Sequence, residues 1–236
     1  MRVVAAGQHH RAVAWGANGS GQLGVGDELD HPEPALLAAL TDDLVAVVSS
    51  HQHTAFVTAS GGLLTCGSSE HAQLGHSDGE CSTIPRPVAG LSGVPICAVA
   101  CGSKHTLALS VAGAVYAWGA GTFGALGLGD EVRGQQSRPL KVSLTLPAVA
   151  VACGVYHSVA LMESGNVMAW GWGRHGQLGD GKEGTHAFIP NKVRGLEGCR
   201  IASVCSGGHH VFARSTDAAC LVWGAGSSGQ LGLGDA

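Results

Sequence analysis

The sequence has little charge, few aromatic residues and little proline. Asp, Glu, Lys and Arg make up 13% of the 236 residues, Phe, Trp and Tyr make up 5%, and proline occurs eight times. The formal net charge is −4, and Lys and Arg form no cluster. Because binding to nucleic-acid phosphates needs a field of basic side chains, no direct DNA binding is expected.

Long apolar runs are missing as well. No stretch approaches the roughly 18 apolar residues of a membrane-spanning helix, and the first residues, MRVVAAGQHHR, lack the apolar core of a signal peptide. We therefore expect a soluble protein without membrane insertion, located in the cytoplasm with the nucleus as the alternative.

The eight cysteines form no C-x-x-C pair. Free cysteine usually behaves as a small buried hydrophobic residue in a reducing compartment, and we expect that behaviour here. Cys97 and Cys101 are four positions apart, as are neighbours on one face of a strand.

Glycine, in contrast, is abundant. There are 38 glycines beside 45% hydrophobic residues, with no G-X-Y period, so neither collagen nor a disordered chain is indicated. The glycines belong to a repeated segment. WGANGSGQLG from Trp15 returns, in steps of 51, 52, 52 and 53 residues, as CGSSEHAQLG from Cys66, WGAGTFGALG from Trp118, WGWGRHGQLG from Trp170 and WGAGSSGQLG from Trp223.

A second landmark repeats in register with the first. One histidine lies 13 residues before each later Trp or Cys66 position: His53, His105, His157 and His210. Two markers in phase predict a single repeat domain over 1–236, with repeats at approximately 1–43, 44–94, 95–146, 147–198 and 199–236.

Each repeat shows the pattern of four short strands. In the third repeat the strands are expected at 96–101, 105–110, 114–118 and about 139–142, separated by glycine-containing turns. No segment has helical periodicity. The sequence therefore predicts an all-β fold, a β-propeller of four-stranded blades, in which the Leu of each QLG or ALG fills the space between blades beside the repeated Trp.

The first and last repeats are incomplete. His10 lies five residues before Trp15, so about eight residues, corresponding to one strand, are expected to be missing there. The last repeat stops at GLGDA. Five repeats therefore predict an incomplete or fragmentary ring, because an open array would expose strand edges that proteins normally cover.

The segment VACGSKHTLALSVAGAVYAWGAGTFGALGLGD, from Val99, resembles the regulator of chromosome condensation repeat, from which it departs mainly at Ala125, where the pattern has Gln. The resemblance implies a seven-bladed propeller. The WGAN opening and the PICAVACG segment from Pro95 also weakly resemble the secretion-regulating exchange-factor branch of that family.

Two apparent site motifs follow the repeat. The G-x-G-x-x-G spacing at Gly119, Gly121 and Gly124 recurs after Trp170 and Trp223, but neither a following helix nor an acidic residue about twenty positions on completes a dinucleotide fingerprint. The four repeat histidines should diverge on successive blades, so we expect them to bond backbone groups at blade turns and not to hold a metal. No cofactor is expected.

The residues that break the repeat are the candidate partner-binding residues. Trp172 replaces the Ala120 of the third repeat, Arg174 and His175 follow it, and Phe123 occupies the His175 position. Large aromatic residues with Arg on a loop of small residues are typical of interface anchors. The alternative is that Trp172 covers the outer edge of its own blade.

These observations favour a protein–protein interaction scaffold without an intrinsic catalytic site. The alternative, implied by the resemblance, is a guanine nucleotide exchange factor for a small GTPase, although the regular repeat lengths leave no room for the long wedge insertion of the Ran-type members. Light sensing as in the similar plant ultraviolet-B photoreceptor is disfavoured, because the positions before the repeat histidines carry no Trp; they are Gln52, Lys104, Tyr156 and His209.

Overall fold

The computed structural model describes residues 2–6 and 11–234, and these form five antiparallel sheets. In chain order, the five sheets are built from β1 (Arg2–Ala6), β2 (Arg11–Gly16) and β3 (His31–Leu36); β4 (Leu44–Ser49), β5 (His53–Thr58), β6 (Leu63–Gly67) and β7 (Ser82–Pro87); β8 (Ile96–Cys101), β9 (His105–Ser110), β10 (Val115–Ala120) and β11 (Gln135–Lys141); β12 (Ala148–Cys153), β13 (His157–Met162), β14 (Val167–Gly173) and β15 (Thr185–Lys192); and β16 (Ile201–Ser206), β17 (His210–Ser215) and β18 (Cys220–Gly224).

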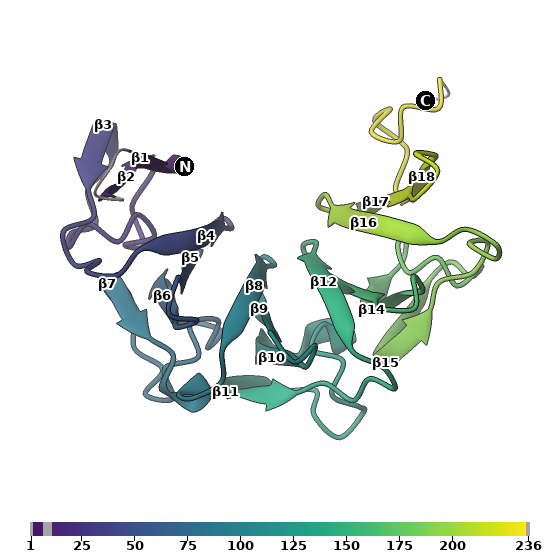
Figure 1. The fold of residues 1–236 in the computed structure, drawn as a ribbon, viewed down its shortest axis with the longest axis horizontal. Coiled ribbons are helices and arrows are strands. Elements are labelled where there is room, and N and C mark those ends of the chain that lie inside the picture. The colour runs from purple at the N-terminus through teal and green to yellow at the C-terminus, as the bar shows by residue number, and fades with distance from the viewer. Residues whose placement is uncertain (1, 7–10, 235–236) are drawn as a thin grey trace.

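The five sheets are the blades of an open propeller. Figure 1 shows them around an arc, with β4, β8, β12 and β16 nearest its middle and β7, β11 and β15 on the outside. Within each blade the strands pair in chain order, so every blade is a meander. Short 3-10 turns at Ala89–Leu91 and Thr122–Gly124 are the helical elements among the described residues. The predicted all-β propeller fold is confirmed, and none of these helical segments is long enough to cross a membrane.

The third blade tests the predicted strands directly. β8 and β9 have the predicted bounds, and β10 extends two residues further than expected. β11 begins at Gln135, earlier than the predicted start at about residue 139. Its first half is polar, and a bulge interrupts its pairing with β10. The polar residues of this outer strand hide it from a search for apolar alternation.

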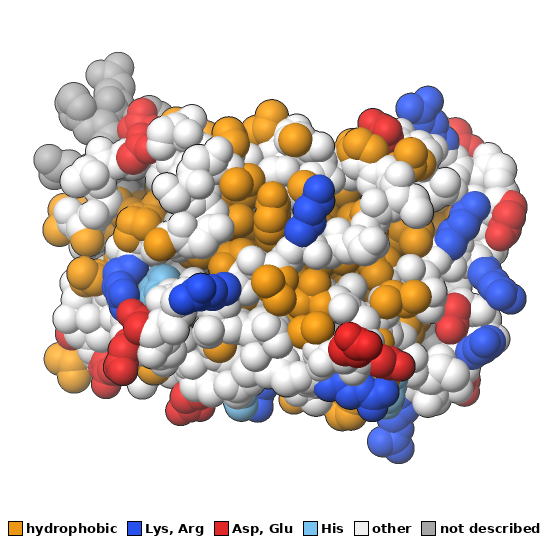
Figure 2. Space-filling model, turned by 90° about the horizontal axis from the view of Figure 1, so that it is seen from below, with side chains coloured by type: hydrophobic (Ala, Val, Ile, Leu, Met, Phe, Trp, Pro, Cys, Tyr) orange, Lys and Arg blue, Asp and Glu red, His pale blue; other side chains and the backbone are white. Residues whose placement is uncertain are grey.

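The same bulge occurs on every described outer strand and contains a proline. The register shifts between Ala117 and Gly119 on β10, opposite the segment of β11 that holds Pro139. Pro34, Pro85 and Pro190 lie in the corresponding segments of β3, β7 and β15. Since proline cannot donate to a ladder, these bulges limit further pairing at the outer edges. Figure 2 looks onto this convex side, where hydrophobic side chains run along the middle.

The first blade differs from the expectation for its missing strand. Arg2 of β1 lies opposite Trp15 of β2, as Thr54 of β5 lies opposite Cys66 of β6. The described part of the first blade therefore has a strand at the position of β5, and the strand without a counterpart is the innermost one. His10, which suggested a gap in front of Trp15, lies outside the described residues.

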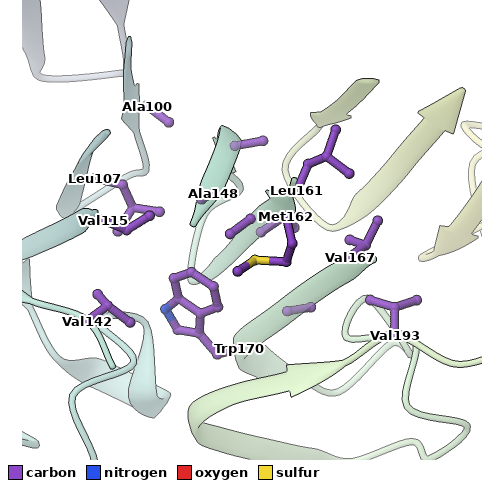
Figure 3. Close-up of a cluster of buried hydrophobic side chains, with 14 of the residues drawn as sticks. Ala100, Leu107, Val115, Val142, Ala148, Leu161, Met162, Val167, Trp170 and Val193 are labelled. Atoms are coloured by element: carbon purple, nitrogen blue, oxygen red, sulfur yellow. The ribbon is translucent and has the colours of Figure 1, made fainter. Parts of the chain in front are cut away.

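Buried hydrophobic side chains fill the spaces between blades. Figure 3 shows Trp170 of β14 between Met162 of its own blade and Val115 and Val142 of the third blade. Leu126 belongs to the same cluster, as expected for an apolar residue between blades. Trp118 and Trp170 are both fully buried. The interblade core thus combines one large ring with small aliphatic side chains.

Each repeat Trp also donates a hydrogen bond to the blade before it. The indole Nε1 atoms of Trp118, Trp170 and Trp223 lie 2.9, 3.0 and 3.0 Å from the carbonyl oxygens of Gln73, Ala125 and Gln177. These acceptors occupy one repeat position, the residue before the Leu of QLG or ALG. In the second blade Cys66 takes the Trp position, and its Sγ lies 3.6 Å from the carbonyl oxygen of Gln22.

The repeat histidines bridge successive blades. Nε2 of His53, His105 and His157 lies 2.9, 3.0 and 2.9 Å from the hydroxyl oxygens of Thr106, Ser158 and Ser206 on the next blade. The expectation that these imidazoles bond backbone groups at their own turns is therefore wrong for Nε2. The residue after the repeat histidine, Thr106 or Ser158, carries a hydroxyl group that could have indicated this bond. Its partner is the histidine of the preceding blade.

The hydroxyl groups at these junctions make a second bond. Thr54, Thr106 and Ser158 donate through their side-chain oxygens to the carbonyl oxygens of Gln22, Gln73 and Ala125, at 2.6, 2.7 and 2.8 Å. In the fifth blade Val211 follows the histidine, and Ser206, at the position of Cys153, supplies the hydroxyl to His157. The hydroxyl group thus comes from another position of the repeat, and the histidine still has a hydroxyl partner on the next blade.

The cysteines agree with the expected burial only in part. Cys66 is buried and Cys101 and Cys153 are half-buried, but Cys81, Cys97, Cys199, Cys205 and Cys220 are exposed. Cys97 and Cys101 do not share an environment, because the ladder of β8 shifts between Ile96 and Ala98. Burial raises the pKa of the Cys101 thiol to about 12, which keeps it protonated and unreactive.

The buried histidines predict a pH-dependent stability. Burial lowers the pKa of His53 to about 4 and those of His105 and His157 to about 3. The unfolded chain binds protons near pH 6.5, so the free energy of unfolding should be constant above that pH and fall as pH decreases toward 4. Three such groups give a slope of up to about 4 kcal/mol per pH unit near pH 5.

Urea unfolding between pH 4.5 and 7.5 measures this slope. The exposed His51 supplies the control, since His51→Asn should leave the slope unchanged, whereas His105→Asn should reduce it by about a third. A flat profile across this range would show that the buried histidines take up protons without unfolding.

Two glycines of one loop test the packing of the Trp. A Cβ atom on Gly127 would lie 2.7 Å from Nε1 of Trp170, whereas one on Gly129 would meet nothing within 4 Å. Both residues have positive φ, 69° and 96°. Gly129→Ala should therefore cost about 1–2 kcal/mol for its backbone alone, and Gly127→Ala clearly more. Equal urea midpoints for the two variants would contradict the tight ring packing.

Candidate protein-docking site

The candidate residues lie at one end of the blades. Each inner strand ends there in the turn before the repeat histidine, and each Trp strand ends there in its glycine-rich loop, because the strands of a meander alternate in direction. We call this the histidine-turn end. Residues far apart in the sequence therefore meet there across blade boundaries.

Phe123, Tyr156 and Trp172 form the centre of an aromatic cluster at this end. The Phe123 and Trp172 ring centroids are 5.9 Å apart, with 25° between the ring planes. Tyr156 meets both rings edge-on, at 5.6 Å from Phe123 and 6.1 Å from Trp172. Aromatic pairs with these geometries attract one another beyond the effect of burial, which fixes the positions of the rings.

Three histidines extend the cluster. His186 lies 4.9 Å from the Phe123 ring, and His175 and His209 lie 5.3 and 5.1 Å from Trp172. We call the six residues, Phe123, Tyr156, Trp172, His175, His186 and His209, the aromatic platform. Burial, followed by His175 and His210, lowers the pKa of His209, which keeps this ring neutral over a wider pH range.

The platform draws on three blades. Phe123 comes from the 3-10 turn of the third blade and His209 from the turn between β16 and β17 of the fifth, and the remaining members belong to the fourth. Phe123, at 37% exposure, His175 and His186 are exposed, whereas Tyr156, Trp172 and His209 are half-buried. Trp172 faces His186 on the outer strand of its own blade and also contacts rings of both neighbouring blades.

Three of the four candidate residues are therefore brought together. Phe123, Trp172 and His175 belong to the platform, and the exposed Arg174 lies beside them in the chain without a ring contact. Sequence reasoning missed Tyr156, His186 and His209. Tyr156 and His209 hold the position before the repeat histidine, and that position varies from Gln52 to Lys104 along the chain, so repeat variation was the available signal.

Equivalent positions meet at the preceding blade boundary, but with different chemistry. His71, which corresponds to Phe123, is bonded through Nδ1 to Nε2 of Gln135 at 3.1 Å, and Gln135 corresponds to His186. The same two repeat positions therefore meet at both boundaries, but the side chains at these positions differ. At the boundary between the third and fourth blades these positions carry the rings of Phe123 and His186 instead.

The G-x-G-x-x-G segment does not form a phosphate cradle. The position of a Cβ on Gly119, Gly121 or Gly124 is faced by a backbone carbonyl oxygen at 2.5, 2.6 or 2.5 Å, from Lys104, Gly134 and Ala187 respectively. These glycines permit close approach of backbones. Carbonyl oxygens repel a phosphate, which requires N–H donors.

The residues that the structure describes also contain no group of three or more His, Cys, Asp or Glu that could hold a metal ion. The side chains at the histidine-turn end can therefore offer ring faces, ring edges and imidazole nitrogens to another molecule.

Comparison with known proteins accounts for this repeated architecture. The family model described as the regulator of chromosome condensation (RCC1) repeat matches residues 9–57, 60–109, 112–161 and 164–214. The chain belongs to the RCC1 repeat family. Each matched unit runs from a Trp strand into the histidine strand of the next blade, and so contains one blade junction.

Relatives of known sequence are longer than this chain. The chain is 37% identical over 193 residues to the probable E3 ubiquitin-protein ligase HERC6 of Homo sapiens, covering 81% of this chain and 19% of the relative. It is 33% identical over 225 residues to the ultraviolet-B receptor UVR8 of Arabidopsis thaliana, covering 94% of this chain and 50% of UVR8. The chain thus spans at most half the length of these RCC1 relatives.

Solved structures show the same fold. Human WBSCR16 superposes with a TM-score of 0.88 at 23% identity, over 99% of this chain and 61% of that protein. Prp20p from Saccharomyces cerevisiae, a structure described together with binding to Gsp1p and histones, superposes with a TM-score of 0.81 at 20% identity, over 96% of this chain and 56% of Prp20p. These likenesses, at 20–23% identity, show that the chain shares the propeller fold of both proteins.

Proposed function

We propose that this chain is a protein-interaction scaffold whose aromatic platform docks a partner protein. The observation that supports the proposal is the gathering of Phe123, Tyr156 and Trp172 at one end of the arc, across the boundary between the third and fourth blades. Interface hot spots are enriched in Trp and Tyr, and they lie where large side chains can be desolvated completely.

Burial and rigidity support the same role. The platform rings restrain one another, so little side-chain freedom would be lost when a partner covers them. The exposed position of Phe123 is unusual in a chain with only 5% aromatic residues. The fully buried Trp118 and Trp170 of the blade junctions belong to the repeat, whereas the platform residues are exposed or half-buried and differ from repeat to repeat.

The complex is expected in the cytoplasm, with the nucleus as the alternative. All eight cysteines are free, which fits a reducing compartment. Guanine nucleotide exchange on a small GTPase is the second candidate, because it too requires only a docking surface and no catalytic residues of its own. The likeness to Prp20p is a likeness of fold and does not choose between the two.

Removal of the central ring tests the docking function. We expect Trp172→Ala, in the protein that carries this chain, to weaken binding to a purified partner at least tenfold, because it deletes the residue that contacts Phe123, Tyr156 and two histidines. Ile189→Ala removes an exposed residue, 57% accessible on the outer strand, and should leave the dissociation constant unchanged. Equal effects of the two substitutions would contradict docking at the platform.

A panel of small GTPases loaded with fluorescent GDP separates the two candidate functions and supplies defined partners. Accelerated GDP release that Trp172→Ala abolishes would identify exchange. Stable binding without faster GDP release supports the scaffold. Tight binding that Trp172→Ala does not weaken would show that the partner docks outside the platform.

A further inference from the structure

Five glycine-rich loops follow the repeat Trp or Cys66, and four of them contain the same side-chain hydrogen bond. Oε1 of Gln22, Gln73, Gln177 and Gln230 accepts the backbone N–H of the residue two positions earlier, at distances of 2.9, 2.9, 2.8 and 2.7 Å. The residues held in this way are Ser20, His71, His175 and Ser228. None of them has positive φ.

The loop of the third blade lacks this contact. Ala125 stands at the Gln position and has no side-chain oxygen, so it cannot hold the N–H of Phe123. Instead, the N–H of Ala125 bonds to the carbonyl oxygen of Thr122 at 3.2 Å. Phe123 has φ 58° and ψ 15°, and Gly124 has φ 84°, so the four residues form a turn with positive φ at both central positions.

This conformation is costly for Phe123. A bulky residue in the left-handed region is an outlier, because its Cβ atom lies too close to the following carbonyl oxygen. In the folded chain, contacts of its ring with Tyr156, Trp172 and His186 offset the cost. Strained residues that the surroundings hold in place occur preferentially at functional sites, which directs attention to this loop.

An exposed cationic residue lies beside the platform in the chain. Arg174 follows Trp172 by two residues, and Lys104 holds the position of Tyr156 one blade earlier. Neither makes an ion pair among the described residues. On the glycine-rich loops of the third and fourth blades, Asp130 forms an ion pair with Arg133. Asp180 accepts hydrogen bonds from the backbone N–H of Lys182 and from the hydroxyl of Thr185. Arg174, exposed and two residues from Trp172, therefore offers its guanidinium group to a partner at the platform.

Resting on the docking function above, we propose that the absence of Gln at position 125 builds the platform, and that the platform takes an apolar or aromatic side chain of a partner peptide flanked by carboxylates. The Ala125 turn releases Phe123 from the ordinary loop conformation and places its ring on Trp172 and Tyr156. The partner's apolar side chain covers these rings, and its carboxylates pair with Arg174.

The positioning claim is tested by Ala125→Gln, which restores the side chain found in the other four loops. Nuclear Overhauser contacts between the Phe123 and Trp172 rings should be present in the original protein and lost in the variant, because the Gln side chain would hold the N–H of residue 123. Persistence of these contacts in a folded Ala125→Gln variant would overturn the claim.

A second substitution covers failure of that variant to fold. Phe123→Asn keeps the turn, because Asn tolerates positive φ, and removes the ring. It should raise the urea midpoint or leave it unchanged if the turn is strained by Phe123. A large loss of stability would mean that Phe123 is chiefly a structural residue, and it would overturn the proposal.

The partner claim uses random dodecapeptides displayed on phage as the probe. Peptides selected on the protein that carries this chain should combine Phe, Trp, Leu or Ile with neighbouring Asp or Glu. Synthetic copies should bind at least tenfold more weakly to Phe123→Asn, to Ala125→Gln and to Arg174→Glu, with Ile189→Ala as the unaffected control.

Selection of basic peptides, or of peptides that bind all these variants equally, would contradict the partner claim. So would a selection that enriches no peptide. In either case a whole-protein partner whose binding still depends on Trp172 would leave the docking function standing, so that failure of the inference and failure of the function can be told apart.

Discussion

The arc depends on the backbone carbonyl of the residue before the Leu in each QLG or ALG motif, such as Gln73 or Ala125. This carbonyl accepts the indole N–H of the next blade's Trp and also the hydroxyl of the residue after the next blade's histidine. Both donors are buried. An unbonded indole N–H or hydroxyl in such an environment would cost about 1–3 kcal/mol, so the carbonyl and its donors fix how far apart two blades can lie.

The same constraint explains most of the composition. The ring of Trp170 lies so close to Gly127 that no side chain fits there, and the imidazole of His105 is buried beside Ser158. Burial keeps this imidazole neutral, and its hydrogen bond gives it a partner on the next blade. Glycine, histidine and tryptophan are therefore tied to the junction. Function is left to side chains that the junction does not use.

The sequence allowed the propeller, the phase of its repeats and the bounds of β8 and β9 to be predicted, because two landmarks recur with nearly constant spacing. It placed the fourth strand of the third blade at about 139–142, whereas β11 begins at Gln135, because the polar first half of this strand and its bulge break the alternation of apolar residues. The partner of the repeat histidine was missed as well, since it lies about fifty residues away on another blade. Cys97 was misjudged because a register shift in β8 changes the face on which it lies.

The candidate site was predictable to a similar degree. Trp172, His175 and Phe123 stood out because they break the repeat, and the structure brings them together. Tyr156 and His209 are ordinary polar or aromatic residues in a turn, and only the packing of adjacent blades places them against Trp172. Ala125 was noticed as a departure from the repeat, but its effect on Phe123 depends on a backbone geometry that no spacing reveals.

A double-mutant cycle between His105→Leu and Ser158→Ala tests the bonding between blades most directly, with His51→Leu and Ser158→Ala as the control pair. If the imidazole and the hydroxyl hold adjacent blades together, unfolding free energies should show a coupling of about 1 kcal/mol for the first pair and none for the second. Additive effects in both pairs would contradict the account.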